Sequence, residues 1–200
     1  MEMTRMKNPL SYQFTEYDCG PTSVLNAISY LYERQEIPPD FMKHIVQCCM
    51  DTYNEQGEPY RWGTSTDAMN YMATWFNRYA KAVKFPIYCE HICGSQVYLA
   101  KESPIYQCLK QGGAVVARCY LTVPHYITLT GIDDDYVYVF DAYYEDTLVK
   151  REGILCVDDM PKQMNRKIAW KVMDNAGTGD YSLGESNFRD VTLFYKKNVL

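Results

Sequence analysis

Residues 13–21 have the sequence QFTEYDCGP and lead directly into a helical pattern. Apolar residues recur at three- and four-residue spacing over residues 21–34, which predicts a helix. Pro21 suits the first turn of that helix, because its missing N–H needs no partner there. Cys19 is therefore expected at the helix N-terminus, where unpaired backbone N–H groups and the helix dipole favour a thiolate. The alternative is an ordinary buried cysteine near a helix start.

The rest of the chain places helices first and strands second. Pro38-Pro39-Asp40 is expected to begin a second helix, and Thr64-Ser65-Thr66 to cap a third after a polar loop over residues 51–63. Later β-branched and aromatic runs predict strands at residues 83–88, 114–121, 126–132, 136–141, 153–157, 168–173 and 191–195, with a short helix at 104–111. This order predicts an α+β fold with an antiparallel sheet. The length fits one domain over residues 1–200. Residues 145–200 either belong to this domain or form a family-specific C-terminal extension of it.

Composition excludes several classes of protein. The chain has 20 basic and 25 acidic residues, and no basic tract, so we expect no nucleic-acid partner. It has neither a signal peptide nor an apolar run long enough for a membrane helix, so we expect a cytoplasmic protein without a membrane partner. The eight cysteines would stay reduced there. No cofactor is predicted, and the oligomeric state stays open.

His125 is the strongest candidate for a base that activates a thiol. It opens the apolar pattern over residues 126–132, and the returning strand pattern ends at Asp141, 16 residues after the histidine. A tight turn centred near Asp133 would place His125 and Asp141 opposite one another. A carboxylate in that position orients an imidazole, as the third member of a nucleophile–base–orienter triad does.

The other two histidines have weaker patterns around them. His44 falls between apolar pairs in the second predicted helix and is expected to be a partly exposed helix residue. His91 lies in CEHIC at residues 89–93, which suggests a metal site at first sight. Alternate positions on a strand supply three ligands there but no second pair of the Cys-x-x-Cys kind, so zinc is the weaker alternative and no metal is predicted.

Taken together, these motifs resemble those of the papain-like cysteine peptidases. The shared pattern is Gln13, then Cys19-Gly20 at a helix start, then His125 before an aromatic residue, then a strand that ends in Asp141. The most similar branch is the bacteriocin-processing type, which acts on double-glycine leaders. The resemblance implies a papain-like fold in which Cys19 is the nucleophile and His125 the base and acid. It further implies that Asp141 orients the imidazole and that the Gln13 amide binds the oxyanion.

The resemblance implies a hydrolase that cleaves peptide or amide bonds through a Cys19 acyl-enzyme. One alternative is an acyltransferase of the same clan, which includes the phytochelatin synthases. Another is an inactive papain-like domain that binds a peptide, although the presence of all four site residues argues against it. The chain departs from the branch in two ways. Residues 1–200 contain no membrane span and no nucleotide-binding motif, whereas the peptidases of this branch are usually part of a membrane exporter, and Ala142 follows Asp141 where the branch commonly has proline.

Overall fold

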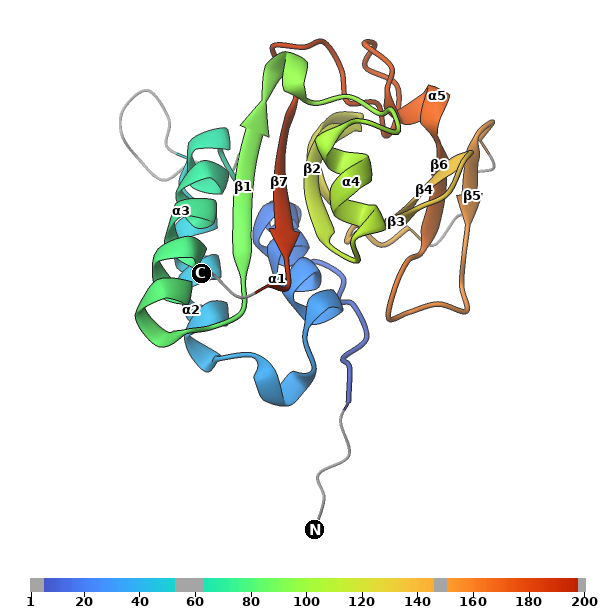
Figure 1. Cartoon of the computed structure of the whole chain (residues 1–200). Coiled ribbons are helices and arrows are strands. Elements are labelled where there is room, and N and C mark those ends of the chain that lie inside the picture. The colour runs from blue at the N-terminus through green and yellow to red at the C-terminus, as the bar shows by residue number, and fades with distance from the viewer. Residues whose placement is uncertain (1–5, 53–62, 146–150, 198–200) are drawn as a thin grey trace.

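The computed structural model describes residues 6–52, 63–145 and 151–197, which form a seven-stranded sheet with helices on both faces (Figure 1). The helices are α1 (Cys19–Leu31), α2 (Pro39–Cys49), α3 (Thr66–Val83), α4 (Pro104–Lys110) and α5 (Trp170–Met173), with short 3₁₀ helices at Arg34–Glu36 and Gly94–Gln96. The strands are β1 (Tyr88–Cys93), β2 (Ala114–Leu121), β3 (Val123–Ile132), β4 (Tyr136–Phe140), β5 (Ile154–Cys156), β6 (Arg166–Ala169) and β7 (Asp190–Tyr195).

The sheet is antiparallel throughout and has the order β1-β7-β2-β3-β4-β6-β5. The predicted α+β fold with N-terminal helices on an antiparallel sheet is confirmed. β7 comes last in the chain but lies between β1 and β2 (Figure 1). Because the centre of the sheet depends on this strand, we propose that residues 145–200 complete one domain with the residues before them.

Two of the predicted strands are wrong in part. Residues 83–88 were expected to be a strand, but α3 continues to Val83 and ends at Lys84 in the left-handed conformation. The apolar stripe of α3, with Phe76 and Ala80 buried, carries the helix as far as the β-branched Val83. At residues 168–173 the strand stops at Ala169, opposite the first residue of β4, so β6 has no partner beyond that point. The predicted polar loop at 51–63 lies largely outside the described residues.

Buried hydrogen bonds fix α1 on β3 and so position the two elements that carry Cys19 and His125. The Ser23 hydroxyl donates to the Tyr126 carbonyl at 3.0 Å, and the Thr128 hydroxyl donates to the Ser23 carbonyl at 3.0 Å. All three residues are buried, so these bonds are shielded from water. The N-terminus of α1 is therefore held close to the start of β3.

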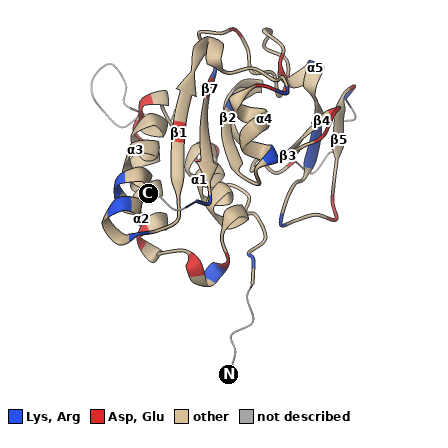
Figure 2. Ribbon diagram, viewed as in Figure 1, with Lys and Arg blue, Asp and Glu red and all other residues tan. Residues whose placement is uncertain are grey.

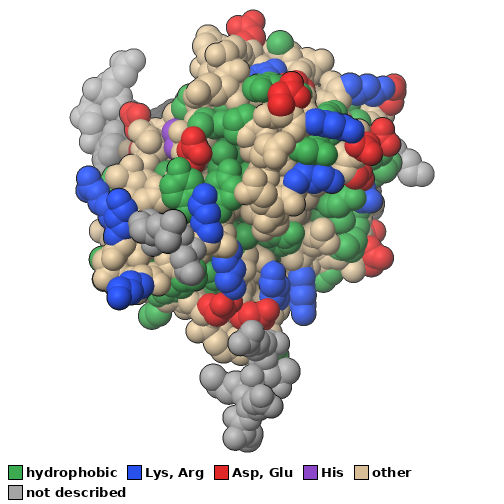
Figure 3. Space-filling view, in the orientation of Figure 1, with side chains coloured by type: hydrophobic (Ala, Val, Ile, Leu, Met, Phe, Trp, Pro, Cys, Tyr) green, Lys and Arg blue, Asp and Glu red, His purple; other side chains and the backbone are tan. Residues whose placement is uncertain are grey.

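Charged side chains of both signs are interspersed over the ribbon and over the face shown in space-filling form (Figures 2 and 3). No helix among the described residues has the length and apolar character needed to cross a membrane.

Gly113 provides a test of how the chain packs after α4. A Cβ atom there would lie 2.7 Å from the Phe194 carbonyl oxygen and 2.9 Å from the Cys108 carbonyl oxygen. We expect Gly113→Ala to lower the free energy of unfolding by about 1–3 kcal/mol, because neither backbone group moves easily. Urea unfolding measures this. Gly179→Ala is the matched control, since nothing lies within 4 Å of its Cβ position, and wild-type stability in Gly113→Ala would contradict the packing.

Candidate active site

Cys19 is the first residue of α1 and is half-buried. Asp18 occupies the N-cap position, but its carboxylate accepts no N–H from the helix. It turns back instead and accepts the N–H groups of Phe14 at 2.9 Å and Thr15 at 2.6 Å. Among the described residues, none accepts a hydrogen bond from the Cys19 N–H. The loop before the helix is thus tied down while the Cys19 N–H stays available at the positive end of α1.

Gly20 lets the segment that precedes α3 approach the start of α1. A Cβ atom on Gly20 would lie 2.0 Å from the Thr64 Oγ1 atom. That hydroxyl donates to the Cys49 carbonyl at the end of α2. Gly20 therefore allows Thr64 to form one wall beside Cys19.

The structure brings His125 and Asp141 together, with 2.8 Å between His125 Nε2 and Asp141 Oδ1. Both side chains are buried. Because Nε2 faces the carboxylate, the other ring nitrogen is left for Cys19, which lies close enough to His125 to raise the pKa of the imidazole. The structure thus brings a thiol, an imidazole and a carboxylate together.

The contact forms in a register that differs from the expected one. The β3–β4 ladder pairs Thr128 with Phe140, so Asp141 continues opposite Ile127 and lies diagonal to His125. A β-bulge in this ladder adds a residue to β3, and the turn lies later than expected. Diagonal neighbours on one face remain within reach of long side chains, which explains why the contact survives the shift.

Asp141 is held by four groups besides the imidazole. The Tyr181 hydroxyl donates to Oδ2 at 2.7 Å and the Tyr143 N–H to Oδ1 at 2.9 Å. The Asn165 side chain accepts the Asp141 N–H at 2.8 Å and donates to the Asp141 carbonyl at 2.7 Å. Burial raises the pKa of Asp141, but the His125 charge and hydrogen bonds from His125, Tyr181 and Tyr143 outweigh it and lower the pKa. The carboxylate is therefore kept ionised.

The pKa of His125 is raised to about 10. Burial lowers it, but hydrogen bonds and charge interactions with Asp141 and Cys19 more than compensate. These contacts favour the protonated imidazole, and a positive charge beside a sulfur favours the thiolate in general. This is the electrostatic arrangement that a thiol nucleophile requires.

Gln13 lies beside the end of β4, since its N–H donates to the Ala142 carbonyl at 2.9 Å. Its side-chain Nε2 donates to the Thr15 carbonyl at 2.7 Å, and its buried Oε1 has no hydrogen-bond partner among the residues that the structure describes. Among the described residues, no hydrogen bond joins the Gln13 amide to Cys19. The structure thus places Gln13 next to the Asp141 segment without showing its amide directed at the thiol.

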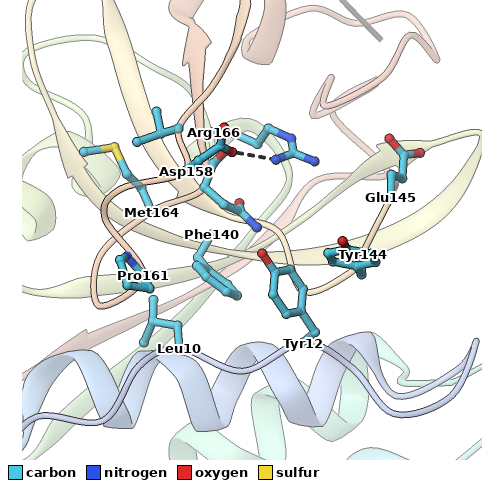
Figure 4. A pocket seen from close by; sticks show the side chains of 11 residues that line it. Leu10, Tyr12, Phe140, Tyr144, Glu145, Asp158, Pro161, Met164 and Arg166 are labelled. Carbon is cyan, nitrogen blue, oxygen red and sulfur yellow. Dashed lines mark hydrogen bonds between the residues drawn. The ribbon is translucent and has the colours of Figure 1, made fainter. Parts of the chain in front are cut away.

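Two cavities flank these residues. One, of about 440 Å³, is lined by Cys19, by residues 64–67 and by Arg118 and Tyr126. The other, of about 240 Å³, contains the rings of Tyr12, Phe140 and Tyr144 and is shown in Figure 4. Two residues that line the second cavity are next to site residues in the sequence, because Gln13 follows Tyr12 and Asp141 follows Phe140.

The other two histidines are engaged elsewhere. His91 Nε2 lies 3.1 Å from the Cys93 sulfur, and its Nδ1 lies 3.0 Å from the Thr192 hydroxyl. The described residues contain no group of three or more histidine, cysteine or acidic side chains that would hold a metal ion. His44 stacks on Trp75 with 4.0 Å between ring centroids.

The sheet, the helices packed on it and the thiol at the start of α1 define a papain-like fold. The chain belongs to the Peptidase_C39 like family, whose model matches residues 6–177. The resemblance to the double-glycine leader peptidases is thereby confirmed at the level of the family, which supports a cysteine peptidase-like function. Tyr181 lies beyond the matched residues.

One similar solved structure is the "crystal structure of a double glycine motif protease from AMS/PCAT transporter in complex with the leader peptide". The two chains share 12% sequence identity and a TM-score of 0.48, over 99% of this chain and 96% of that one. No curated protein matches this chain.

The His125–Asp141 pair predicts how the histidine titrates. In the wild type, we expect the NMR signal of His125 to titrate near pH 10, and in Asp141→Asn at a lower pH, because the contacts with Asp141 that raise the pKa are then lost. The folded-state pKa is raised, so the stabilisation from this charge is fully present below about pH 6.5 and is lost as the pH rises through about 10.

His44 and His91 are internal controls in the same spectra. Burial lowers the pKa of each, and neither contacts Asp141, so their titrations should not change. A His125 signal that titrates at the same pH in both proteins would contradict the coupling.

Proposed function

We propose that this protein is a cysteine peptidase that cleaves a peptide or amide bond through an acyl-enzyme on Cys19. The observation that supports this most strongly is the buried His125–Asp141 pair with its second ring nitrogen left for Cys19. A merely structural histidine needs neither an ionised partner nor a thiol at a helix N-terminus. The family membership supports the same reaction class.

In the proposed mechanism, the Cys19 thiolate attacks the carbonyl carbon of the scissile bond. The negative charge that develops on the carbonyl oxygen is stabilised by the Cys19 N–H and by the Gln13 amide, after the Gln13 side chain rotates away from Thr15. His125 then protonates the departing amine, and the acyl group stays on the sulfur. Water, deprotonated by His125, attacks the thioester and releases the acid. Asp141 keeps the imidazole oriented through both steps.

The acyl-enzyme also permits transfer of the acyl group to an amine or a thiol other than water. Product analysis by mass spectrometry, with and without added glutathione or a primary amine, separates the two outcomes. We expect the free acid as the main product in both cases.

Reduced thiols are required for the reaction, and the eight cysteines are free, which supports a reducing compartment such as the cytoplasm.

Alkylation by iodoacetamide at neutral pH tests the activation of Cys19. We expect Cys19 to react faster than the more exposed Cys93. Burial and the charges of Asp190 and Asp67 raise the pKa of Cys93, whereas the imidazolium stands beside Cys19. Peptide mapping by mass spectrometry gives the rate at each cysteine. Faster labelling of Cys93, or equal rates at all cysteines, would exclude an activated Cys19.

Substitution of Gln13 tests the proposed oxyanion contact. We expect Gln13→Ala to lower kcat for peptide hydrolysis by about 10²–10³-fold with little change in KM, because the contact is made mainly in the transition state. Cys19→Ala should abolish turnover and serves as the baseline. An increase in KM without a fall in kcat would assign Gln13 to substrate binding instead.

A further inference from the structure

A row of polar side chains crosses the sheet beneath the cavity that Cys19 lines. Arg118 of β2 pairs with Tyr126 of β3, and Asp190 of β7 pairs with Cys93 of β1. β7 and β2 are neighbours, and Arg118 Nη1 lies 3.7 Å from Asp190 Oδ2. Residues that pair across antiparallel strands project from the same face. The row thus runs from Tyr126 through Arg118 and Asp190 to Cys93, with the Tyr126 end in the cavity of Cys19.

The guanidinium of Arg118 is held between an aromatic ring and a hydroxyl. It lies over the Phe188 ring, 4.1 Å from the centroid, and Phe188 is stacked on Tyr120 at 4.2 Å with an interplanar angle of 14°. Its Nη1 also donates to the Thr66 hydroxyl at 3.4 Å. The distance to Asp190 is longer than a hydrogen bond, so that carboxylate attracts the guanidinium without binding it directly. A guanidinium stacked in this way is preorganised for a planar ligand.

Arg118 has donors left over. Among the hydrogen bonds of the described residues, it uses Nη1 alone, so Nε and Nη2 have no acceptor there. Asp190 does not supply one, because its Oδ2 lies 3.7 Å from Nη1, beyond hydrogen-bond distance. The Asp190 oxygens instead accept the hydroxyls of Thr66 at 2.8 Å and Tyr126 at 3.2 Å. The Arg118 side chain is 28% exposed and lines the cavity. Unused guanidinium donors in a cavity beside a nucleophile are suited to a carboxylate.

Among the described residues that line this cavity, Asp67 is the other charged one. Asp67 is exposed in the first turn of α3, and its charge acts on His91 and Cys93, at the β1 end of the polar row. Among the described residues that line the cavity, Arg118 is thus the one that carries a positive charge.

We propose that Arg118 determines specificity in a subsite that binds an acidic side chain, Glu or Asp, close to the scissile bond. The proposal rests on the proposed peptidase function, since Cys19 lines the same cavity. Phe188 and Asp190, which position Arg118, lie outside residues 6–177, the part matched by the family model. The preference is thus assigned to this chain from its own contacts.

The test uses two libraries of short synthetic peptides that are identical except for one fixed position, which is Glu in one library and Gln in the other. Binding to Cys19→Ala, which cannot form the acyl-enzyme, is compared for the two libraries by mass spectrometry of the retained peptides. We expect an enrichment of about tenfold for Glu, as a charge-assisted bidentate contact provides. The same libraries are then offered to the wild type, and cleavage is measured.

Arg118→Gln and Arg118→Met, each combined with Cys19→Ala, should bind both libraries equally. Arg78→Gln is the matched control, because Arg78 is an exposed residue of α3 outside the cavity, and it should keep the preference for Glu. An equal affinity for both libraries in Cys19→Ala, or a preference that survives in both Arg118 variants, overturns the proposal. Where the Arg118 variants do not fold, rising salt should reduce the Glu enrichment and leave Gln binding unchanged; an enrichment insensitive to salt overturns the proposal.

The binding comparison and the cleavage measurement distinguish a failure of this inference from a failure of the proposed function. Cleavage without a Glu preference removes the role of Arg118 and leaves the peptidase intact. A Glu preference in binding without any cleavage by the wild type supports the carboxylate subsite and removes the peptidase function.

Discussion

The contact between His125 and Asp141 is the interaction on which the rest of the site depends. Both groups are buried, and a buried charge is costly unless it is paired and hydrogen-bonded. The imidazole and the carboxylate are hydrogen-bonded to each other. The Tyr181 hydroxyl donates to the second carboxylate oxygen of Asp141, and the Asn165 side chain bonds to the backbone N–H and carbonyl of Asp141. Asp141 favours the protonated form of the imidazole that lies beside Cys19, and a cation beside a thiol favours the thiolate.

The pair depends on segments that are far apart in the chain. Ser23 ties α1 to β3 and so brings Cys19 towards His125. The Tyr181 hydroxyl comes from a segment that follows α5, and the next strand, β7, inserts into the middle of the sheet. That C-terminal region also provides the ring of Phe188 beneath Arg118. One region of the chain therefore supports both the proposed catalytic pair and the cavity beside it.

The sequence permits prediction of the parts of the site that are local. Cys19 is placed by a helical stripe and a proline in the first turn, and His125 and Asp141 by a single hairpin. The exact register is not predictable, because a β-bulge leaves no clear pattern in a run of β-branched residues. Tyr181 and Asn165 are missed, because they reach Asp141 across 40 and 24 residues, and neither lies in a recognisable motif.

Arg118 is missed for a related reason. In the sequence it is one polar residue in an apolar strand, and its importance comes from the ring of Phe188 and from Asp190 on a strand that is distant in the chain. The helices and most strands follow from periodicity, whereas α3 and β6 end where burial and strand pairing dictate, which the local pattern does not reveal.

The ultraviolet absorbance of the thiolate tests the central claim most directly. The difference spectrum between the wild type and Cys19→Ser at neutral pH reports whether Cys19 is ionised. The account predicts a thiolate band in the wild type that disappears in His125→Ala, because the imidazolium stabilises the anion. A wild-type spectrum without this band at neutral pH, or a band that persists without His125, would contradict the proposed thiolate–imidazolium pair.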